Sequence, residues 1–292
     1  MIAPASNLKA EMLEAGLLEL ESLGFKTRVA DGILERDRYT AGSATRRAEE
    51  LRSMLRDDTV SAIFCSRGGY GSGHLLSLVD EVEIRSHPKI LCGASDVTML
   101  LAAFQKAGVV GFHGPMVATA LRQGDAVYDR GLLIRMLVEG EAVDFPMEGC
   151  SVLHAGRAEG RLTGGCLSLV VSTLGTPWEI DTSDAILVLE DANCRPYQVD
   201  RMLTHLRQSG KFDRLRGCVV GEMLGCTQHP DQDYSIEDVF RDALRDLNVP
   251  VLFGFPTGHS SKPNAIVPFG VQARLSLEGK AGFKLLESAV DG

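Results

Sequence analysis

The chain has 292 residues, of which 45% are hydrophobic and 24% charged, so it holds ample apolar material for a sizeable core. Its formal net charge is −9 and it contains no strongly basic run. A nucleic-acid partner is therefore not expected, because phosphates require a basic face. The N-terminus shows no basic segment followed by an apolar one, and no apolar stretch approaches about 18 residues. We expect a cytoplasmic protein with no membrane partner.

The seven cysteines are odd in number and form no C-x-x-C pair, which is typical of reduced, mostly buried thiols in a cytosolic protein. No H-x-x-x-H spacing or His/Cys cluster is present. The nearest grouping, Cys226 with His229 and Asp231, has no obvious fourth ligand. Neither Walker A nor G-x-G-x-x-G occurs. We therefore expect no metal and no cofactor.

Helical and strand patterns alternate along the first part of the chain. Apolar spacing predicts helices over 7–23, 44–57, 74–78 and 96–106, and strands over 25–29, 60–65, 89–93 and 109–113. Short apolar strands between helices indicate a parallel sheet covered on both faces. We expect a doubly wound, flavodoxin-like α/β domain over residues 1–120.

The second half is richer in strands. Residues 121–155 are interpreted as a connecting segment with one helix at 128–139. Beyond it, strands are predicted at 185–189, 217–223, 251–253, 272–277 and 283–286, and helices near 164–174, 197–209 and 235–246. We therefore expect residues 156–292 to form a second domain of mixed α/β type.

Ser95 stands between the strand that ends at Gly93 and the helix that begins near Asp96. A serine on a tight strand-to-helix turn is held out of the sheet with helix N-terminal amides directed toward it, which favours attack on a carbonyl. The sequence differs from the hydrolase elbow G-x-S-x-G because Val97 replaces the second glycine. A helix N-cap at Ser95 or Asp96 explains the same residues, and on local sequence alone it is the more ordinary explanation.

A Gly-rich segment at 67–73 follows the strand at 60–65. Its glycines let the backbone approach a ligand closely and offer free N–H groups. In an open parallel sheet, loops at the carboxyl ends of adjacent strands share one crevice. The Gly-rich segment and the Ser95 turn both follow strands, so they can face each other, and the segment can supply an oxyanion amide.

An acyl-transfer serine needs a base, and the base needs an acid that orients it. Glu190 and Asp191 end the apolar strand at 185–189, and His259 lies in the Gly/Pro/Ser-rich loop 255–263. A carboxylate at a strand end is usually solvated, and a loop histidine is more often incidental than catalytic. On pattern alone six other histidines compete with His259, namely His74, His87, His113, His154, His205 and His229.

A set of short motifs runs along nearly the whole chain in a characteristic order. They are Arg-Gly-Gly-Tyr-Gly at 67–71, Gly-Ala-Ser-Asp-Val-Thr at 93–98, His-Gly-Pro-Met at 113–116, Leu-Thr-Gly-Gly at 162–165, Leu-Gly-Thr-Pro at 174–177, Leu-Glu-Asp at 189–191 and Gly-His at 258–259. No single motif is decisive, but the ordered set resembles the LD-carboxypeptidase family, which includes microcin-immunity relatives.

The resemblance implies a Ser–Glu–His triad of Ser95, Glu190 and His259. Because the serine would belong to the first domain and the other two to the second, it implies an active site in the interdomain cleft. It further implies an oxyanion hole made by the amides of Asp96 and Gly69. Family members are commonly homodimers, so the resemblance also implies a homodimer.

The implied activity is hydrolysis of the amide between an L-centre and a terminal D-alanine in cell-wall tetrapeptides. Arg67, beside the Gly-rich segment, is the candidate partner for the free carboxylate of this small peptide substrate, although a surface role explains Arg67 equally well. A close alternative is hydrolysis of peptidyl or aminoacyl nucleotides, as in the microcin-immunity branch. An alternative of another class is a non-catalytic small-molecule-binding protein.

Two positions depart from the pattern of many relatives. Where many relatives have Gly-Gly-Asn, this chain has a segment that ends in Cys166. Where they have Glu-Asp-x-x-Glu, this chain has a segment that ends in Cys194. Neither change removes a member of the implied triad. They therefore bear on the substrate rather than on the reaction.

Overall fold

Residues 1–290, which the computed structural model describes, form two units that are each built around a sheet of their own. Unit 1 comprises Met1–Gly131 and Lys262–Gly270. Unit 2 comprises Leu132–Ser261 and the residues from Val271 onward. Within residues 1–290, no helix is both long enough and apolar enough to span a bilayer.

The sheet of unit 1 has the order β1-β2-β3-β9. Its parallel strands are β1 (Ala62–Phe64), β2 (Ile90–Gly93) and β3 (Gly111–His113). The edge strand β9 (Val267–Phe269) is antiparallel to β3 and comes from the short return of the chain into this unit. Phe64 pairs with Cys92 at the carboxyl ends of β1 and β2, so the loops that follow these two strands begin at the same edge of the sheet.

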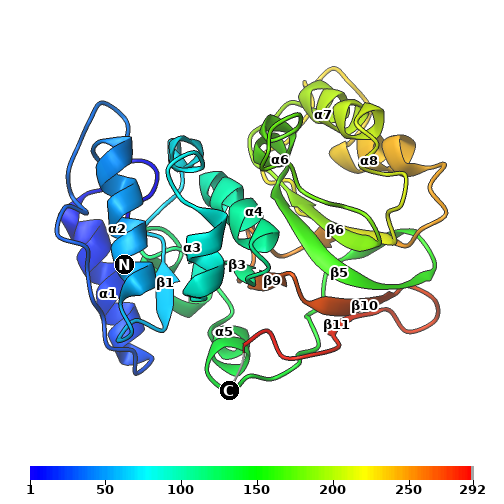
Figure 1. Cartoon of the computed structure of the whole chain (residues 1–292). Helices are drawn as coiled ribbons and strands as arrows, with labels where there is room; N and C mark the ends of the chain where they lie inside the picture. Colours follow the sequence, from blue (N-terminus) through cyan, green and yellow to red (C-terminus); the bar gives the residue numbers. More distant parts are fainter. Residues whose placement is uncertain (291–292) are drawn as a thin grey trace. The chain divides into compact units, whose positions relative to one another are not determined.

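Helices alternate with these strands (Figure 1), although the third begins at Glu81, after its N-cap Asp80, and not at 74–78 as predicted. They are α1 (Ala10–Ser22), α2 (Ala44–Arg56), α3 (Glu81–Ser86) and α4 (Thr98–Lys106), with 3-10 turns at Ser72–Leu75, Ser95–Val97 and Leu121–Ala126. In α2 the Ser43 hydroxyl caps the first turn by accepting the Arg46 N–H. The strand predicted at 25–29 was wrong: these residues form no ladder, and Lys26, Thr27 and Arg28 offer little apolar surface to bury.

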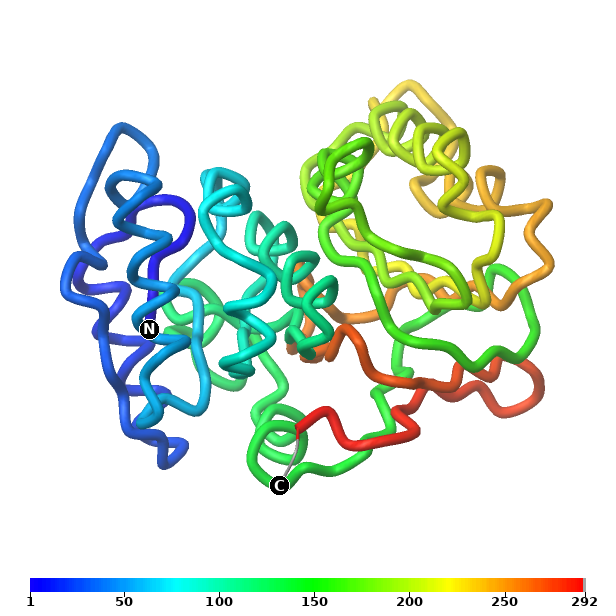
Figure 2. Tube along the Cα trace, viewed as in Figure 1, coloured from blue at the N-terminus to red at the C-terminus, as the bar shows by residue number. Residues whose placement is uncertain are grey.

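The sheet of unit 2 has the order β11-β10-β5-β6-β7-β8-β4. Four neighbouring strands are parallel, namely β5 (Arg157–Cys166), β6 (Ala185–Glu190), β7 (Gly217–Gly221) and β8 (Val251–Phe255). The flanking strands β4 (Ser151–His154), β10 (Gln272–Ser276) and β11 (Gly282–Leu285) are antiparallel to their neighbours. Figure 2 shows the red C-terminal segment returning alongside the green trace of β5.

The helices of unit 2 are α5 (Arg130–Leu137), which begins at the unit boundary, α6 (Leu167–Ser172), α7 (Pro196–Gln208) and α8 (Ile236–Leu244). The last three lie together over one face of the larger sheet (Figure 1). The two sheets confirm the predicted α/β class, with a doubly wound parallel-sheet unit followed by a strand-rich mixed unit.

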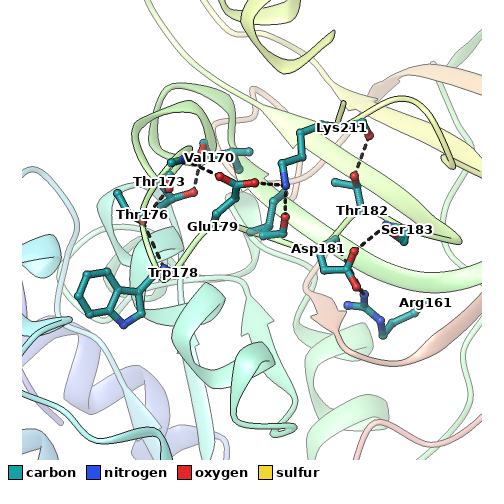
Figure 3. Close-up of polar contacts among 12 residues, drawn as sticks. Arg161, Val170, Thr173, Thr176, Trp178, Glu179, Asp181, Thr182, Ser183 and Lys211 are labelled. Carbon is teal, nitrogen blue, oxygen red and sulfur yellow. Dashed lines mark hydrogen bonds and ion pairs between the residues drawn. The ribbon is translucent and has the colours of Figure 1, made fainter. Parts of the chain in front are cut away.

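The connection from α6 to β6 is fixed by side chains at the amino end of β6 (Figure 3). Lys211 Nζ donates to the Ile180 carbonyl at 2.9 Å and forms an ion pair with Glu179. Thr182 Oγ1 in turn donates to the Lys211 carbonyl at 2.7 Å. All six residues of β6 are buried, so this strand lies in the core in a single register, with Glu190 at its carboxyl end.

Candidate active site

Ser95 occupies a strained turn directly after β2. Its φ is +58°, a left-handed conformation that non-glycine residues rarely adopt outside functional turns. A Cβ added at Gly93 would lie 2.7 Å from a methyl group of Val97 and 3.1 Å from Cys65 Cβ, so only glycine permits this close turn. The serine is half-buried and begins the 3-10 turn that continues into α4. The predicted strand-to-helix elbow is therefore present, and the strain at its serine goes beyond what an ordinary N-cap requires.

The Gly-rich segment lies against this turn. A Cβ added at Gly68 would lie 3.1 Å from Ser95 Oγ and 3.2 Å from the backbone nitrogen of Asp96. Asp96 is buried, and its carboxylate accepts the Ser72 N–H at 2.7 Å while its carbonyl accepts the Ser72 hydroxyl. Loop and turn are thus joined within unit 1, as their shared sheet edge predicts. Gly68, the glycine nearest to Ser95, was missed by sequence reasoning, because nothing distinguishes it from the glycine that follows it.

Gly69 and Arg67 contact the first turn of the chain. A Cβ added at Gly69 would lie 2.4 Å from Ser6 Oγ, and the same hydroxyl accepts the Tyr70 N–H at 3.0 Å. Arg67 is half-buried and one of its guanidinium nitrogens donates to the Asn7 carbonyl at 3.3 Å. Its Nε is buried and has no hydrogen-bond partner among residues 1–290. Arg67 is thus tied to the first turn of the chain by one of its guanidinium nitrogens.

A buried arginine fixes the other end of the Gly-rich segment. The Arg47 side chain is 1% exposed, and its guanidinium donates to the carbonyls of Gly71 at 2.7 Å, Gly42 at 3.2 Å and Pro4. Burial holds the pKa of this guanidinium below its ordinary value, but an arginine remains charged. Arg47 thus joins three separate segments of unit 1 by charge-assisted bonds.

Glu190 and His259 meet directly in unit 2. Glu190 ends β6 and is fully buried, whereas the His259 side chain is 37% exposed. Glu190 Oε2 accepts the backbone N–H of His259 at 2.9 Å and lies 2.8 Å from its Nδ1. Because a carboxylate only accepts, Nδ1 carries the proton in this contact and Nε2 of the neutral ring is left as an acceptor. This is the tautomer that a general base needs.

The charge of Glu190 alters the proton affinity of the ring. The hydrogen bond to Glu190 raises the pKa of His259 above its ordinary value, against the opposing effect of burial, and the charges of Glu190 and Asp191 add to the rise. The pair therefore stabilises an imidazolium, the species that forms when a general base takes a proton.

Two glycines provide the space for Glu190. A Cβ added at Gly258 would lie 2.1 Å from Glu190 Cδ, and one added at Gly221 would lie 2.7 Å from Glu190 Cβ. Gly258 also has φ +68°, which lets the chain turn just before His259. The Gly-His dipeptide is therefore a steric requirement of the buried acid.

Of the two cysteines that depart from the family pattern, Cys166 lies beside Glu190 and Cys194 lies near Asp191. Cys166 is the register partner of Glu190 across β5 and β6, and its buried thiol has a pKa raised by burial and by the charges of Glu190 and Asp191. Burial likewise raises the pKa of Cys194 to about 12, with a further contribution from Asp191. Both thiols are therefore held in the protonated, weakly nucleophilic form. Asp191 itself accepts the N–H groups of Ser168 and Ala192, each at 2.8 Å.

The candidate residues thus fall into two groups. Ser95, Asp96, Gly69 and Arg67 belong to unit 1, and Glu190 and His259 belong to unit 2. Among residues 1–290, no cluster of three or more His, Cys, Asp or Glu side chains is arranged to hold a metal ion. The first group holds a strained serine beside a Gly-rich loop, and the second a histidine whose ring is oriented by a buried carboxylate, which are residue types that acyl transfer uses.

Comparison with known proteins gives matches over both units. Residues 1–114 match the LD-carboxypeptidase N-terminal domain, and residues 159–275 match the LD-carboxypeptidase C-terminal domain. The chain is 38% identical over 284 residues to the probable murein peptide carboxypeptidase of Bacillus subtilis (strain 168), covering 96% of this chain and 89% of that protein. It is 26% identical over 311 residues to the microcin C7 self-immunity protein MccF of Escherichia coli, covering 95% and 89%.

A solved structure shows the same arrangement of elements. The muramoyltetrapeptide carboxypeptidase from Oxalobacter formigenes superposes with a TM-score of 0.86 at 26% identity, covering 97% of each chain. The two matched segments of the present chain include Ser95 in the first and both Glu190 and His259 in the second.

Proposed function

This chain belongs to the LD-carboxypeptidase family, and from that membership we propose that it is a serine peptidase that removes the terminal D-alanine from murein tetrapeptides. The bond cleaved is the amide between an L-centre, such as meso-diaminopimelate or lysine, and the D-alanine. The observation that carries the proposal is the contact between buried Glu190 and His259 Nδ1, in a chain that is 38% and 32% identical to two relatives named murein peptide and murein tetrapeptide carboxypeptidase.

In the proposed mechanism, Ser95, Glu190 and His259 act as a triad. Neutral His259 accepts the Ser95 hydroxyl proton at Nε2 while Oγ attacks the carbonyl carbon of the amide. The imidazolium, stabilised by Glu190, then donates that proton to the nitrogen of the departing D-alanine. Water repeats the sequence on the acyl-enzyme and releases the shortened peptide. The triad requires that the two units bring Ser95 Oγ within hydrogen-bond reach of Nε2.

The remaining assignments concern charge on the substrate. Amides of Asp96 and Gly69 would stabilise the oxyanion, since Asp96 follows Ser95 in the turn that leads into α4 and the Gly-rich segment lies against Ser95. Arg67 would bind the free carboxylate of the D-alanine, because its half-buried, positively charged side chain lies beside that segment.

Release of free D-alanine from murein tetrapeptide tests this function. We expect release by the wild-type protein and none above background with Ser95→Ala, which keeps the size of the turn residue. A wild-type protein that leaves the tetrapeptide intact would contradict the substrate proposed here.

An aminoacyl-nucleotide amide is the second candidate substrate, favoured by the 26% identity to the microcin C7 self-immunity protein over almost the whole chain. The same assay includes such a nucleotide amide as a parallel substrate. Cleavage of the nucleotide amide alone would replace the peptidase assignment with this one, while the serine mechanism would stay the same.

We also propose that the protein acts as a homodimer in the cytoplasm and takes part in peptidoglycan recycling, the last in keeping with its similarity to murein peptide carboxypeptidases. Sedimentation equilibrium tests the assembly. A monomer across the micromolar range would contradict it.

A further inference from the structure

Glu222 is a charged residue for which the triad leaves no role. It directly follows β7, and its carboxylate reaches the loop that carries His259. One oxygen accepts the Ser260 hydroxyl at 2.7 Å. The other accepts both the N–H and the hydroxyl of Ser261, at 3.0 Å and 2.6 Å. One carboxylate therefore binds three donors from the two residues after His259.

The position of Glu222 in the sheet explains this reach. β7 lies between β6, which ends at Glu190, and β8, from which the His259 loop emerges. The residue before Glu222 is Gly221, whose missing side chain makes room for Glu190. The loop is thus held from two adjacent strands, at His259 by Glu190 and just beyond His259 by Glu222.

The loop needs such an anchor. Residues 257–261 lie beyond the end of β8 and contain Gly258 at a positive φ, so the backbone there has no ladder to restrict it. Ordering each residue of a free segment costs roughly 1–2 kcal/mol of conformational free energy. A displacement of about 1 Å in a catalytic group can lower the rate about 100-fold.

We propose that Glu222 is a positioning residue for the catalytic base: by holding Ser260 and Ser261 it fixes the backbone of His259, so that the ring keeps its contact with Glu190. The inference rests on the proposed function in so far as His259 is the base. In this role Glu222 neither contacts the substrate nor takes part in proton transfer.

The decisive comparison is between Glu222→Ala and a matched control, Asp238→Ala. Asp238 also accepts a backbone N–H and a hydroxyl from one serine, Ser235, at 2.8 Å and 2.7 Å, but it does so at the start of α8. We expect Glu222→Ala to lower kcat about 10- to 100-fold with KM changed less than about twofold, because substrate contacts remain and only the base is displaced. The control should leave kcat unchanged.

A second readout is independent of substrate. Titration of the His259 ring by NMR in the free protein should show a raised pKa in wild type and in the Asp238→Ala control. In Glu222→Ala the pKa should fall toward the ordinary histidine value, because the ring is then held less often against Glu190. Glu222→Gln, which keeps one oxygen acceptor, should lie between the two.

The proposal would be overturned if the His259 pKa in Glu222→Ala were the same as in wild type. It would also be overturned if Asp238→Ala lost as much kcat as Glu222→Ala at matched stability. If wild type releases no D-alanine, the proposed function fails, whereas the titration still decides the role of Glu222. Should Glu222→Ala not fold, the double substitution Ser260→Ala/Ser261→Ala removes the same hydroxyl contacts and takes its place in both measurements.

Discussion

The Ser95 turn and the Glu190–His259 pair are held in place by different physical means. Around Ser95 the constraints are steric and involve the backbone: a positive φ, close approaches at Gly93 and Gly68, and loop amides tied to Asp96. Around His259 the constraint is electrostatic, with a buried carboxylate that accepts from both backbone and ring. The first region should therefore be sensitive mainly to added atoms, and the second also to removed charge.

Removal of charge at the acid should have the largest effect. Glu190→Gln keeps the volume of the side chain but removes the charge that stabilises the imidazolium, so we expect kcat/KM to fall about 1,000-fold or more. The raised pKa of His259 should also fall in this variant, because the contact with Glu190 is its main cause. Steady-state kinetics across the pH range measure both effects. An unchanged pH profile would show that Glu190 does not set the proton affinity of His259.

A methyl group added beside Ser95 should have the next largest effect. In Gly68→Ala the new Cβ would lie 2.9 Å from Ser95 Cβ and 3.1 Å from Oγ, so we expect about a 100-fold loss of kcat/KM with little change in stability. Gly73→Ala is the matched control, because its Cβ would meet only the flexible end of Met99. Equal activity in the two variants would contradict a steric constraint on Ser95.

Loss of the buried arginine should act on stability first. Arg47→Met leaves the carbonyls of Pro4, Gly42 and Gly71 without their donor, and we expect the free energy of unfolding to fall by about 3 kcal/mol. Urea unfolding measures this loss. The exposed Arg56→Met, which breaks a surface pair with Glu83, serves as the control and should cost much less. Similar losses in both would show that the three buried bonds add little.

The smallest effect is expected far from the chemistry. Lys211→Met removes the ion pair with Glu179 and the bond to the Ile180 carbonyl at the amino end of β6, which should lower stability by about 1–2 kcal/mol. Because Glu190 lies at the other end of the same strand, kcat at permissive temperature should not change. A loss of kcat without a loss of stability would mean that this connection acts on the site.

Local sequence was enough to predict the buried parallel strands. The apolar run that ends at Glu190 was expected as a strand over 185–189 and is β6, and the strand expected at 89–93 is β2. Such runs are recognisable because both faces of a parallel sheet are buried. The acid at the end of β6 was visible for the same reason.

Long-range pairing was not predictable from local pattern. β9 is three residues long, contains Pro268 and becomes a strand only by pairing with β3, far away in the sequence. β5 alternates arginine, glutamate and glycine, so its strand forms because β6 and β10 flank it. Glu222 was missed for a related reason: it falls within the strand predicted at 217–223, and its partners Ser260 and Ser261 are far away in the sequence.

The rate at which a phosphonofluoridate labels Ser95, measured against pH, tests most directly whether the two regions act on each other. In the proposed triad only neutral His259 can accept the serine proton, and its raised pKa keeps the ring protonated to higher pH. In wild type we therefore expect labelling at Ser95 to rise with pH through a midpoint above the ordinary histidine value. In His259→Ala labelling should be slow and without that rise. Equal rates and equal pH dependence in the two proteins would contradict the proposed triad.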